Sequence, residues 1–346
     1  MKPVDADAWK AKVALPLPTR FRNSKTMQKR RLGQSDLMIS PIVLGGNVFG
    51  WTADEATSFA ILDALVDAGF NTIDTADVYS VWSKSGGGAS ERVIGAWLKA
   101  SGKRDKVVIA TKVGMAMAED KQGLSAAYIA QACEDSLRRL GVETIDLYQS
   151  HKDDPDTPQE ETMEAYARLV KAGKVRAIGS SNFSAERIAS ANAIARANVW
   201  PTYQSEQPQY NLMERTGVEG PLAELALKDK IGLIPFFGLA KGFLSGKYRT
   251  EADLAKSVRG RGVAPYLTPR GMGVLDALDT VAGRQGATPA QVALAWQIAK
   301  PFIAAPIASA TSVGQLQDIL KAAELSLTAE DMTALDLASA PEAATV

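Results

Sequence analysis

The chain is poor in the residues that most often build disulfides, metal sites and general bases. It has a single cysteine, Cys133, and a single histidine, His151. One cysteine cannot form an intramolecular disulfide or a cysteine-based zinc cluster, and we expect no metal site. Cys133 lies at helical spacing from Ile129 and Leu137, which favours a small thiol buried in the core over a nucleophile.

A charge excess and a long apolar run are also missing. Lysine plus arginine and aspartate plus glutamate each number 39, so the formal net charge is zero. We therefore expect no basic surface for nucleic acid or an anionic membrane. No apolar segment approaches the ~18 residues needed to span a bilayer. Pro16 and Pro18 interrupt the apolar stretch where a signal peptide would lie. The sequence predicts a cytoplasmic protein.

Short β-branched or apolar segments alternate with longer amphipathic segments, such as residues 53–68 and 125–140. Eight such strands over about 300 residues predict an α/β fold, the (β/α)8 TIM barrel. A shorter pair, residues 30–32 and 37–39, predicts an N-terminal β-hairpin that closes the bottom of the barrel. The predicted strands are residues 42–44, 71–74, 107–111, 144–149, 175–179, 200–205, 231–235 and 302–305.

The alternation also predicts the domain boundaries. We expect an N-terminal arm over residues 1–26, a single barrel over 27–337 with a long insertion after its seventh strand, and a short tail over 338–346. The competing fold is an open doubly wound sheet, which would carry G-x-G-x-x-G after its first strand. Residues 45–50 read GGNVFG instead, so that fingerprint is absent.

Polar residues follow three successive predicted strands. Asp74 ends the second strand with Tyr79 five residues on, Lys112 ends the third, and His151 ends the fourth. The active site of such a barrel lies at the C-terminal ends of its strands, so we expect these four side chains to converge. Taken singly, Asp74 could cap a turn, Tyr79 could pack in the core, Lys112 could lie on the rim, and His151 could be a satisfied polar residue.

Together the four residues suit proton delivery to a carbonyl oxygen. A tyrosine titrates near ~10, and a nearby ammonium lowers that pKa by about 1–3 units. Asp74 would keep Lys112 charged, and His151 would donate to the oxygen that Tyr79 protonates. No side chain here donates hydride, so a cofactor has to supply it. The same residues leave open a Schiff-base aldolase with Lys112 as nucleophile.

Four segments carry a resemblance that covers residues 30 to about 335. The chain resembles an aldo-keto reductase, in particular the bacterial and potassium-channel-β-subunit-like branches. The resemblance implies an NAD(P)(H)-dependent enzyme that interconverts a carbonyl and its alcohol, with Tyr79 as general acid and base. A cofactor-sensing auxiliary subunit on the same barrel is the alternative. The segments are FNTIDTADVY (70–79), IATKV (109–113), DLYQSH (146–151) and GKVRAIGSSNF (173–183).

The resemblance further implies a nicotinamide dinucleotide across the barrel mouth. Ser181, Asn182 and Gln204 would hold the carboxamide, Phe236 would stack under the ring, and residues 237–247 would hold the pyrophosphate. The implied cofactor residues are Gly46, Asn47, Asp74, Ser181, Asn182, Gln204, Phe236, Phe237, Gly238, Leu239, Ala240, Lys241, Gly242, Leu244, Lys247, Ile307, Ala308, Ser309, Thr311 and Gln315.

The adenosine end departs from the family pattern. Thr311 and Gln315 are neutral where relatives place a cation for the 2′-phosphate, and Ile319 replaces an asparagine. Lys247, Arg249, Arg259 or Arg261 from the insertion could supply the charge, or the cluster could be a solvated loop. NADPH is favoured by the resemblance, and NADH remains an alternative cofactor.

Aromatic residues after the first and second predicted strands suggest an apolar pocket. Phe49, Trp51 and Trp82, with His151, are the expected walls around a small-molecule carbonyl or alcohol. The three aromatic residues could equally pack at the rim. The substrate, the favoured direction and the oligomeric state stay open.

Overall fold

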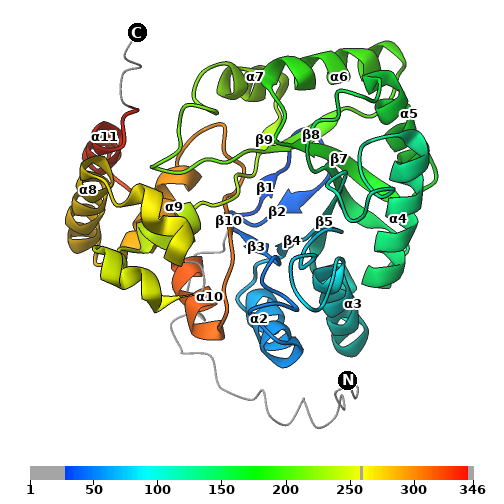
Figure 1. Cartoon of the computed structure of the whole chain (residues 1–346). Coiled ribbons are helices and arrows are strands. Elements are labelled where there is room, and N and C mark those ends of the chain that lie inside the picture. Colours follow the sequence, from blue (N-terminus) through cyan, green and yellow to red (C-terminus); the bar gives the residue numbers. More distant parts are fainter. Residues whose placement is uncertain (1–27, 258–259, 342–346) are drawn as a thin grey trace.

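The computed structural model describes residues 28–257 and 260–341, so the predicted arm over residues 1–26 lies outside the described residues. Eight parallel strands form one sheet in the order β10-β3-β4-β5-β6-β7-β8-β9, and the helices surround it (Figure 1). The strands are β3 (Val43–Gly45), β4 (Thr72–Asp74), β5 (Val108–Val113), β6 (Ile145–Ser150), β7 (Val175–Ser181), β8 (Tyr203–Gln207), β9 (Gly232–Leu233) and β10 (Ile307–Ala308).

Helices follow the strands around the barrel, as a TIM barrel requires. Among the described residues, no helix is long and apolar enough to cross a membrane. The α-helices are α2 (Glu55–Asp67), α3 (Ala89–Ser101), α4 (Ala126–Leu140), α5 (Gln159–Lys171), α6 (Ala185–Ala197), α7 (Pro221–Asp229), α8 (Pro269–Gln285), α9 (Pro289–Ile298), α10 (Val313–Leu320) and α11 (Ala329–Ala338). The 3-10 helices are η2 (Arg104–Lys106), η3 (Ala240–Ser245), η4 (Glu251–Lys256), η5 (Gly260–Tyr266) and η6 (Lys321–Glu324).

The last strand lies later in the chain than the sequence pattern predicts. Residues 302–305 contribute only an isolated bridge between Ile303 and Leu233, so the prediction of a strand there is wrong. Ile307 and Ala308 instead pair with β3. The Ile307 N–H also donates to the Pro235 carbonyl at 2.8 Å, which joins the two edges of the sheet into a near-closed barrel. The long insertion after the seventh strand is present as η3, η4, η5 and α8.

The barrel interior is a separate small core. Alternate residues of the strands point inward, and side chains from β3, β5, β6, β7 and β10 pack there on the N-terminal hairpin. That hairpin is the antiparallel pair β1 (Arg30–Arg31) and β2 (Met38–Ile39). It fills the bottom of the barrel with three buried side chains, Leu32, Leu37 and Ile39.

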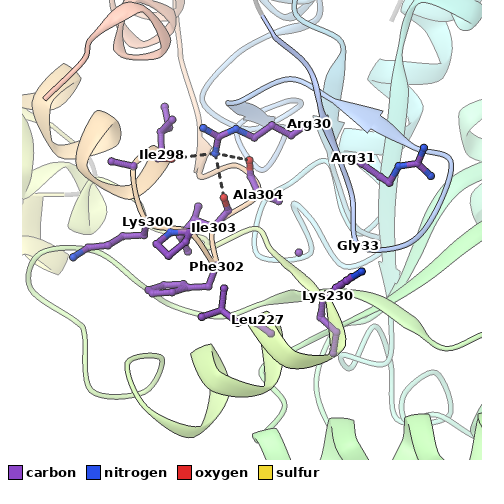
Figure 2. Close-up of a pocket in the computed structure, with 15 residues that line it drawn as sticks. Arg30, Arg31, Gly33, Leu227, Lys230, Ile298, Lys300, Phe302, Ile303 and Ala304 are labelled. Atoms are coloured by element: carbon purple, nitrogen blue, oxygen red, sulfur yellow. Dashed lines mark hydrogen bonds between the residues drawn. The ribbon is translucent and has the colours of Figure 1, made fainter.

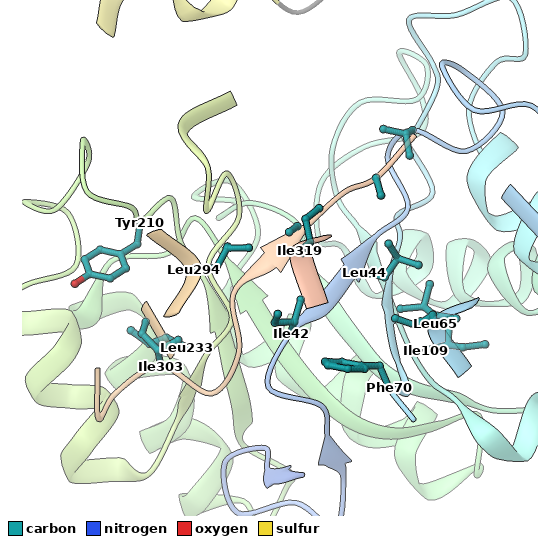
Figure 3. Packing of buried hydrophobic residues seen from close by; sticks show 14 of the residues in the cluster. Ile42, Leu44, Leu65, Phe70, Ile109, Tyr210, Leu233, Leu294, Ile303 and Ile319 are labelled. Carbon is teal, nitrogen blue, oxygen red and sulfur yellow. The ribbon is translucent and has the colours of Figure 1, made fainter. Parts of the chain in front are cut away.

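A larger core lies between the sheet and the surrounding helices. Leu44 from β3, Leu65 from α2 and Ile109 from β5 belong to it, and Figure 3 shows these side chains packed between strand and helix. Cys133 on α4 is fully buried in the same core, as its helical spacing predicts. The C-terminal end of the described chain is tied to the helical shell, because Arg270 of α8 donates to the carbonyl of Ser339 beyond α11.

Basic side chains gather at the bottom of the barrel, where helices end. A cavity of about 490 Å³ there is lined by the hairpin, the end of α7 and the end of α9. Lys230 and Lys300 follow the last residues of these helices, where cations offset the negative end of the helix dipole. Arg30 donates through one nitrogen to the carbonyls of Ile298, Ile303 and Ala304 (Figure 2). This guanidinium therefore ties the hairpin to the last turn of α9.

Replacement of Arg30 by methionine should destabilise the protein. The substitution keeps most of the aliphatic stem and removes the donor to three carbonyls, so we expect a loss of about 1–3 kcal/mol of unfolding free energy. Arg31→Met is the matched control, because Arg31 is exposed and its guanidinium donates to one carbonyl, that of Ser35. Urea unfolding measures both, and equal losses would contradict this role for Arg30.

Candidate active site

Four predicted residues from three strand ends meet at the top of the barrel. The Lys112 ammonium lies 2.7 Å from Asp74 Oδ2 and 2.9 Å from the Tyr79 hydroxyl. The Tyr79 hydroxyl is 3.3 Å from Asp74 Oδ2. The rings of Tyr79 and His151 have their centroids 5.9 Å apart, edge to face. The structure thus brings together the tetrad that the sequence only places at successive strand ends.

The Lys112–Asp74 ion pair is buried on both sides. The Lys112 side chain is 0% exposed and the Asp74 side chain 1%, so water cannot solvate either charge. The ammonium has a third acceptor in the Thr75 carbonyl at 2.9 Å. The second Asp74 oxygen accepts from Gln207 Nε2 at 2.9 Å. A buried charge pair is stable only when its remaining hydrogen-bonding positions are filled, and here these two groups fill them.

Burial sets the protonation of Tyr79 in the direction opposite to the sequence-based expectation. Desolvation, and then the Asp74 carboxylate, raise the pKa of Tyr79 well above 10.0. Desolvation also lowers the pKa of Lys112, against the opposing effect of Asp74. The sequence predicts a lowered pKa for Tyr79, and the structure gives a raised one because desolvation and the Asp74 carboxylate dominate. Tyr79 keeps its proton at neutral pH and can act as a donor.

His151 is a neutral imidazole at the edge of this site. Desolvation, and then the Lys112 charge, hold its pKa well below 6.5. Its Nδ1 is buried and has no hydrogen-bond partner among the described residues. The His151 carbonyl accepts from Asn182 Nδ2 at 3.0 Å, which fixes the backbone at the end of β6. A neutral imidazole can donate one N–H to an oxygen placed beside Tyr79.

One predicted cofactor residue, Gln204, lies at a β-bulge near the start of β8 and binds the far end of the barrel. The pairing of β7 with β8 shifts between Ile178 and Gly179, which pair with Tyr203 and Ser205. Gln204 is the extra residue, and its Oε1 accepts from the Gln34 N–H at 2.7 Å in the hairpin turn. The prediction that Gln204 ends this strand is wrong, since β8 continues to Gln207 at the mouth.

The last residue of β7 and the residue after it are two predicted polar residues, Ser181 and Asn182. The Ser181 hydroxyl donates to the Gln207 carbonyl at 2.8 Å, and Asn182 has a left-handed φ of 59°. The Asn182 amide also donates to Ser181 Oγ at 3.0 Å. The structure therefore places Ser181, Asn182 and Gln207 together, rather than the predicted set with Gln204.

The predicted pyrophosphate loop has a strained backbone. Phe237, Ala240 and Lys241 all have positive φ, followed by Gly242, and such conformations cluster where a loop holds a ligand. Gln297 and Asn211 hold the loop by donating to the carbonyls of residues 238 and 237. Ala240 and Leu244 are fully buried and Leu239 packs on the same core, so these three anchor the loop through their side chains.

The exposed side of this loop carries two aromatic rings and two lysines. The Phe236 and Phe237 rings lie edge to face, 5.1 Å apart. Lys241 Nζ lies 5.6 Å from the Phe237 ring centre, and Lys247 Nζ lies 5.0 Å from that of Tyr248. Neither lysine has an ion pair among the described residues. Arg249 instead binds Asp279 and Asp276 of α8.

The remaining predicted cofactor residues lie where β10 meets β3. Ser309 Oγ donates to Asn47 Oδ1 at 2.7 Å, and the Gly46 N–H donates to the main-chain carbonyl of Asp74 at 2.7 Å. Gln315 Oε1 accepts from both the N–H and the hydroxyl of Thr311. Ile307, Ala308 and Ile319 are buried. Arg261 is exposed, and Arg259 lies outside the described residues.

Two of the three predicted aromatic walls lie at the mouth. Trp82 is 52% and Trp51 36% exposed, and their rings meet edge to face at 5.7 Å. Trp82 lies 6.4 Å from the Tyr79 ring. The prediction that Phe49 lines the pocket is wrong, because Phe49 has no exposed surface and packs in the core between the sheet and the helices.

Sequence reasoning missed three residues that the structure connects to the site. Gln207 binds Asp74, and Glu206 and Asp77 are fully buried carboxyls beside the Asn182 turn and the Tyr79 loop. Glu206 and Gln207 directly follow the predicted strand 200–205, so extending that strand by two residues would have found them. Asp77 lies within the motif that identified Tyr79, but the sequence has no signal that its carboxyl is buried.

Comparison with known proteins gives the family. A model of the aldo/keto reductase family matches residues 41–340. The chain is 36% identical over 318 residues to an uncharacterized oxidoreductase, YrpG, of Bacillus subtilis, covering 90% of this chain and 95% of that protein. The aldo-keto reductase YhdN of the same species is 34% identical, over 83% of this chain and 85% of that protein. A putative voltage-gated potassium channel subunit beta of Schizosaccharomyces pombe is 32% identical, over 90% of this chain and 93% of that protein.

The chain therefore belongs to the aldo/keto reductase family. Members of this family are generally NAD(P)H-dependent oxidoreductases that act on small carbonyl compounds. The barrel, the hairpin beneath it and the tetrad at its mouth agree with that membership.

Asp77 should make the stability of the protein fall as pH rises. Desolvation, and then Glu91, raise the pKa of Asp77 from 3.8 to about 8, and neither of its oxygens has a partner among the described residues. Between these two pKa values, Asp77 is ionised in the unfolded chain and protonated in the folded protein. Its contribution to the unfolding free energy is therefore highest below pH 4 and falls as the pH rises to 8.

The test is Asp77→Asn, which mimics the protonated carboxyl. A tenfold change in a protonation equilibrium corresponds to about 1.4 kcal/mol, so we expect Asp77→Asn to raise the unfolding free energy at pH 7 by a few kcal/mol and to flatten its decline between pH 4 and 8. Urea unfolding across that range measures both effects. Asp105→Asn, at an exposed position, should leave the pH profile unchanged, and an unchanged profile in Asp77→Asn would contradict the assignment.

Proposed function

We propose that this protein is an NAD(P)(H)-dependent oxidoreductase that interconverts an aldehyde or ketone and its alcohol, with Tyr79 as general acid and base. One observation carries the proposal. The protonated Tyr79 hydroxyl lies 2.9 Å from a buried ammonium and beside a neutral imidazole, and part of Tyr79 stays exposed. This arrangement suits an acid that protonates a carbonyl oxygen.

The residues at the mouth fit a nicotinamide dinucleotide. Ser181, Asn182 and Gln207 offer the donors and acceptors that a carboxamide needs, and the Phe236 and Phe237 rings offer faces for a planar ring. The strained loop from Phe237 to Gly242 is typical of a backbone that holds phosphate. Asn47, Ser309, Thr311 and Gln315 would line the adenosine end. When bound, the cofactor supplies the hydride that no side chain here can donate.

The chain's own groups account for the proton. Tyr79 and neutral His151 orient the substrate oxygen by hydrogen bonds, and reduction draws the Tyr79 proton onto that oxygen. The Lys112 ammonium, already 2.9 Å away, stabilises the phenolate that remains. Asp74 and the Thr75 carbonyl hold the ammonium in place. In the oxidation direction the phenolate takes the proton back from the alcohol.

We further propose that the substrate is largely apolar. Trp51, Val81 and Trp82 are exposed near Tyr79, and large exposed aromatic side chains around a reactive group mark a recognition surface. The charges closest to the Tyr79 hydroxyl, on Asp74 and Lys112, satisfy each other.

Replacement of Tyr79 by phenylalanine should abolish reduction and leave cofactor binding intact. The change removes the proton donor, so we expect kcat for reduction of an aromatic aldehyde such as 4-nitrobenzaldehyde to fall about 10²–10⁴-fold. The NADPH dissociation constant should change less than threefold. Tyr128→Phe is the control, because Tyr128 lies on α4 outside the tetrad. Full activity in Tyr79→Phe would refute the proposed mechanism.

The two alternatives give different results in the same assay. A Schiff-base aldolase would be trapped on Lys112 by borohydride without any dinucleotide. An auxiliary cofactor-sensing subunit would bind NADPH but show no turnover that depends on Tyr79. Turnover that needs both the cofactor and Tyr79 separates the reductase from both.

NADPH should bind more tightly than NADH, and with a steeper salt dependence. Lys241 and Lys247 have no ion pair among the described residues, so both can pair with the 2′-phosphate or pyrophosphate. Titration followed by tryptophan fluorescence measures both affinities. The double variant Lys241→Met/Lys247→Met should weaken NADPH about tenfold or more and reduce its advantage over NADH. Lys230→Met, at the bottom of the barrel, should change neither. Equal affinities in the unmutated protein would contradict NADPH preference.

A further inference from the structure

Glu206 is a fully buried glutamate that the proposed mechanism does not use. It lies on β8 beside the Gln207 that binds Asp74, with none of its surface exposed. No lysine or arginine pairs with it among the described residues. Desolvation raises the pKa of Glu206 to about 8, so its carboxyl is neutral at pH 7. Burying a polar group of this kind is unfavourable unless its hydrogen bonds are made.

Both Glu206 oxygens bind the segment that follows β7. Oε1 accepts from the Phe183 N–H at 3.1 Å, and Oε2 shares a hydrogen bond with the Ser180 hydroxyl. The Ser180 hydroxyl also lies 3.4 Å from the Ser205 carbonyl. In a neutral carboxyl the carbonyl oxygen can accept from Phe183 while the carboxyl proton lies between Oε2 and Ser180. The carboxyl therefore forms hydrogen bonds with the residues on both sides of Ser181 and Asn182.

The segment that Glu206 binds, residues 180–183, contains an unfavourable backbone conformation. Asn182 has a φ of 59°, and a left-handed residue other than glycine persists only when its surroundings fix it. On the opposite side, the Ser181 hydroxyl and the Asn182 N–H both donate to the Gln207 carbonyl. Residues 206 and 207 thus hold the turn from two directions. Ser181 and Asn182 themselves bind the Gln207 and His151 carbonyls, whereas Glu206 binds the residues on either side of them.

We propose that Glu206 is a positioning residue for the nicotinamide end of the cofactor: its carboxyl clamps Ser180 and Phe183 so that Ser181 and Asn182 face the bound carboxamide. This inference rests on the proposed function, because it assumes a dinucleotide at the mouth. It assigns Glu206 no contact with the cofactor or the substrate. Its effect should therefore appear only for ligands that carry the nicotinamide.

The test compares Glu206→Gln with Glu206→Leu in the full-length protein. Glutamine keeps an oxygen for the Phe183 N–H and an N–H for Ser180, whereas leucine keeps the bulk and removes both hydrogen bonds. We expect the dissociation constants of NADPH and NADH to stay within twofold in Glu206→Gln and to rise tenfold or more in Glu206→Leu. 2′-Phospho-ADP-ribose, which lacks only the nicotinamide, should bind all three proteins equally.

Three results would overturn the inference. Equal weakening of all three ligands in Glu206→Leu would show a general loss of structure, and unchanged NADPH binding would show that the clamp is not needed. Loss of binding in Glu206→Gln would show that hydrogen bonding by a neutral group is not enough. If Glu206→Leu does not fold, Ser180→Ala removes one end of the clamp and should weaken NADPH without affecting the fragment; unchanged NADPH binding there overturns the inference.

The unmutated protein separates this inference from the proposed function. If it binds neither dinucleotide, the proposed function fails before any variant is made. If it binds and reduces carbonyls while Glu206→Leu behaves like the unmutated protein, only the role of Glu206 fails.

Discussion

The buried ion pair between Lys112 and Asp74 is the interaction on which the rest of the site depends. Both side chains have essentially no exposed surface, so each charge is stable only because the other lies 2.7 Å away. The pair joins β4 to β5 at the top of the barrel. Its remaining positions are filled by the Thr75 carbonyl and by Gln207, which ties β8 into the same cluster. Tyr79 can lie beside a full positive charge only because this arrangement holds the charge in place.

The two ends of the barrel use charge for different purposes. At the bottom, Arg30, Lys230 and Lys300 lie where helices end, and Arg30 binds main-chain carbonyls. Arg30 thereby satisfies carbonyls that a helix end leaves unpaired, and Lys300 pairs with the Asp336 carboxylate of α11. At the top, the buried charges of Lys112 and Asp74 neutralise each other, and the exposed lysines lie on the strained loop after β9. Basic residues therefore bind main-chain and carboxylate oxygens at the bottom, whereas Lys241 and Lys247 stay exposed on the loop after β9.

Buried neutral carboxyls are a second theme of the upper half of the barrel. The pKa values of Asp77 and Glu206 are both raised to about 8, with desolvation as the largest cause. Asp77 lies two residues before Tyr79, and Glu206 grips the turn that carries Asn182. Each has a cost for folding at neutral pH, because the unfolded chain would ionise them. Such costs are common where the backbone next to an active site has to be held in one conformation.

The sequence by itself determined the barrel, the hairpin and the four residues that form the tetrad, because alternation and strand ends are local patterns that a linear chain records. Only the tertiary structure decided the rest. The bounds of β8 and its register on β7 place Gln204 beside the hairpin and Gln207 at the mouth, because register is fixed by the neighbouring strand. Burial reversed the expected direction for the pKa of Tyr79 and removed Phe49 from the pocket. Desolvation depends on side chains that come from all around the barrel, and no segment of the sequence contains that information.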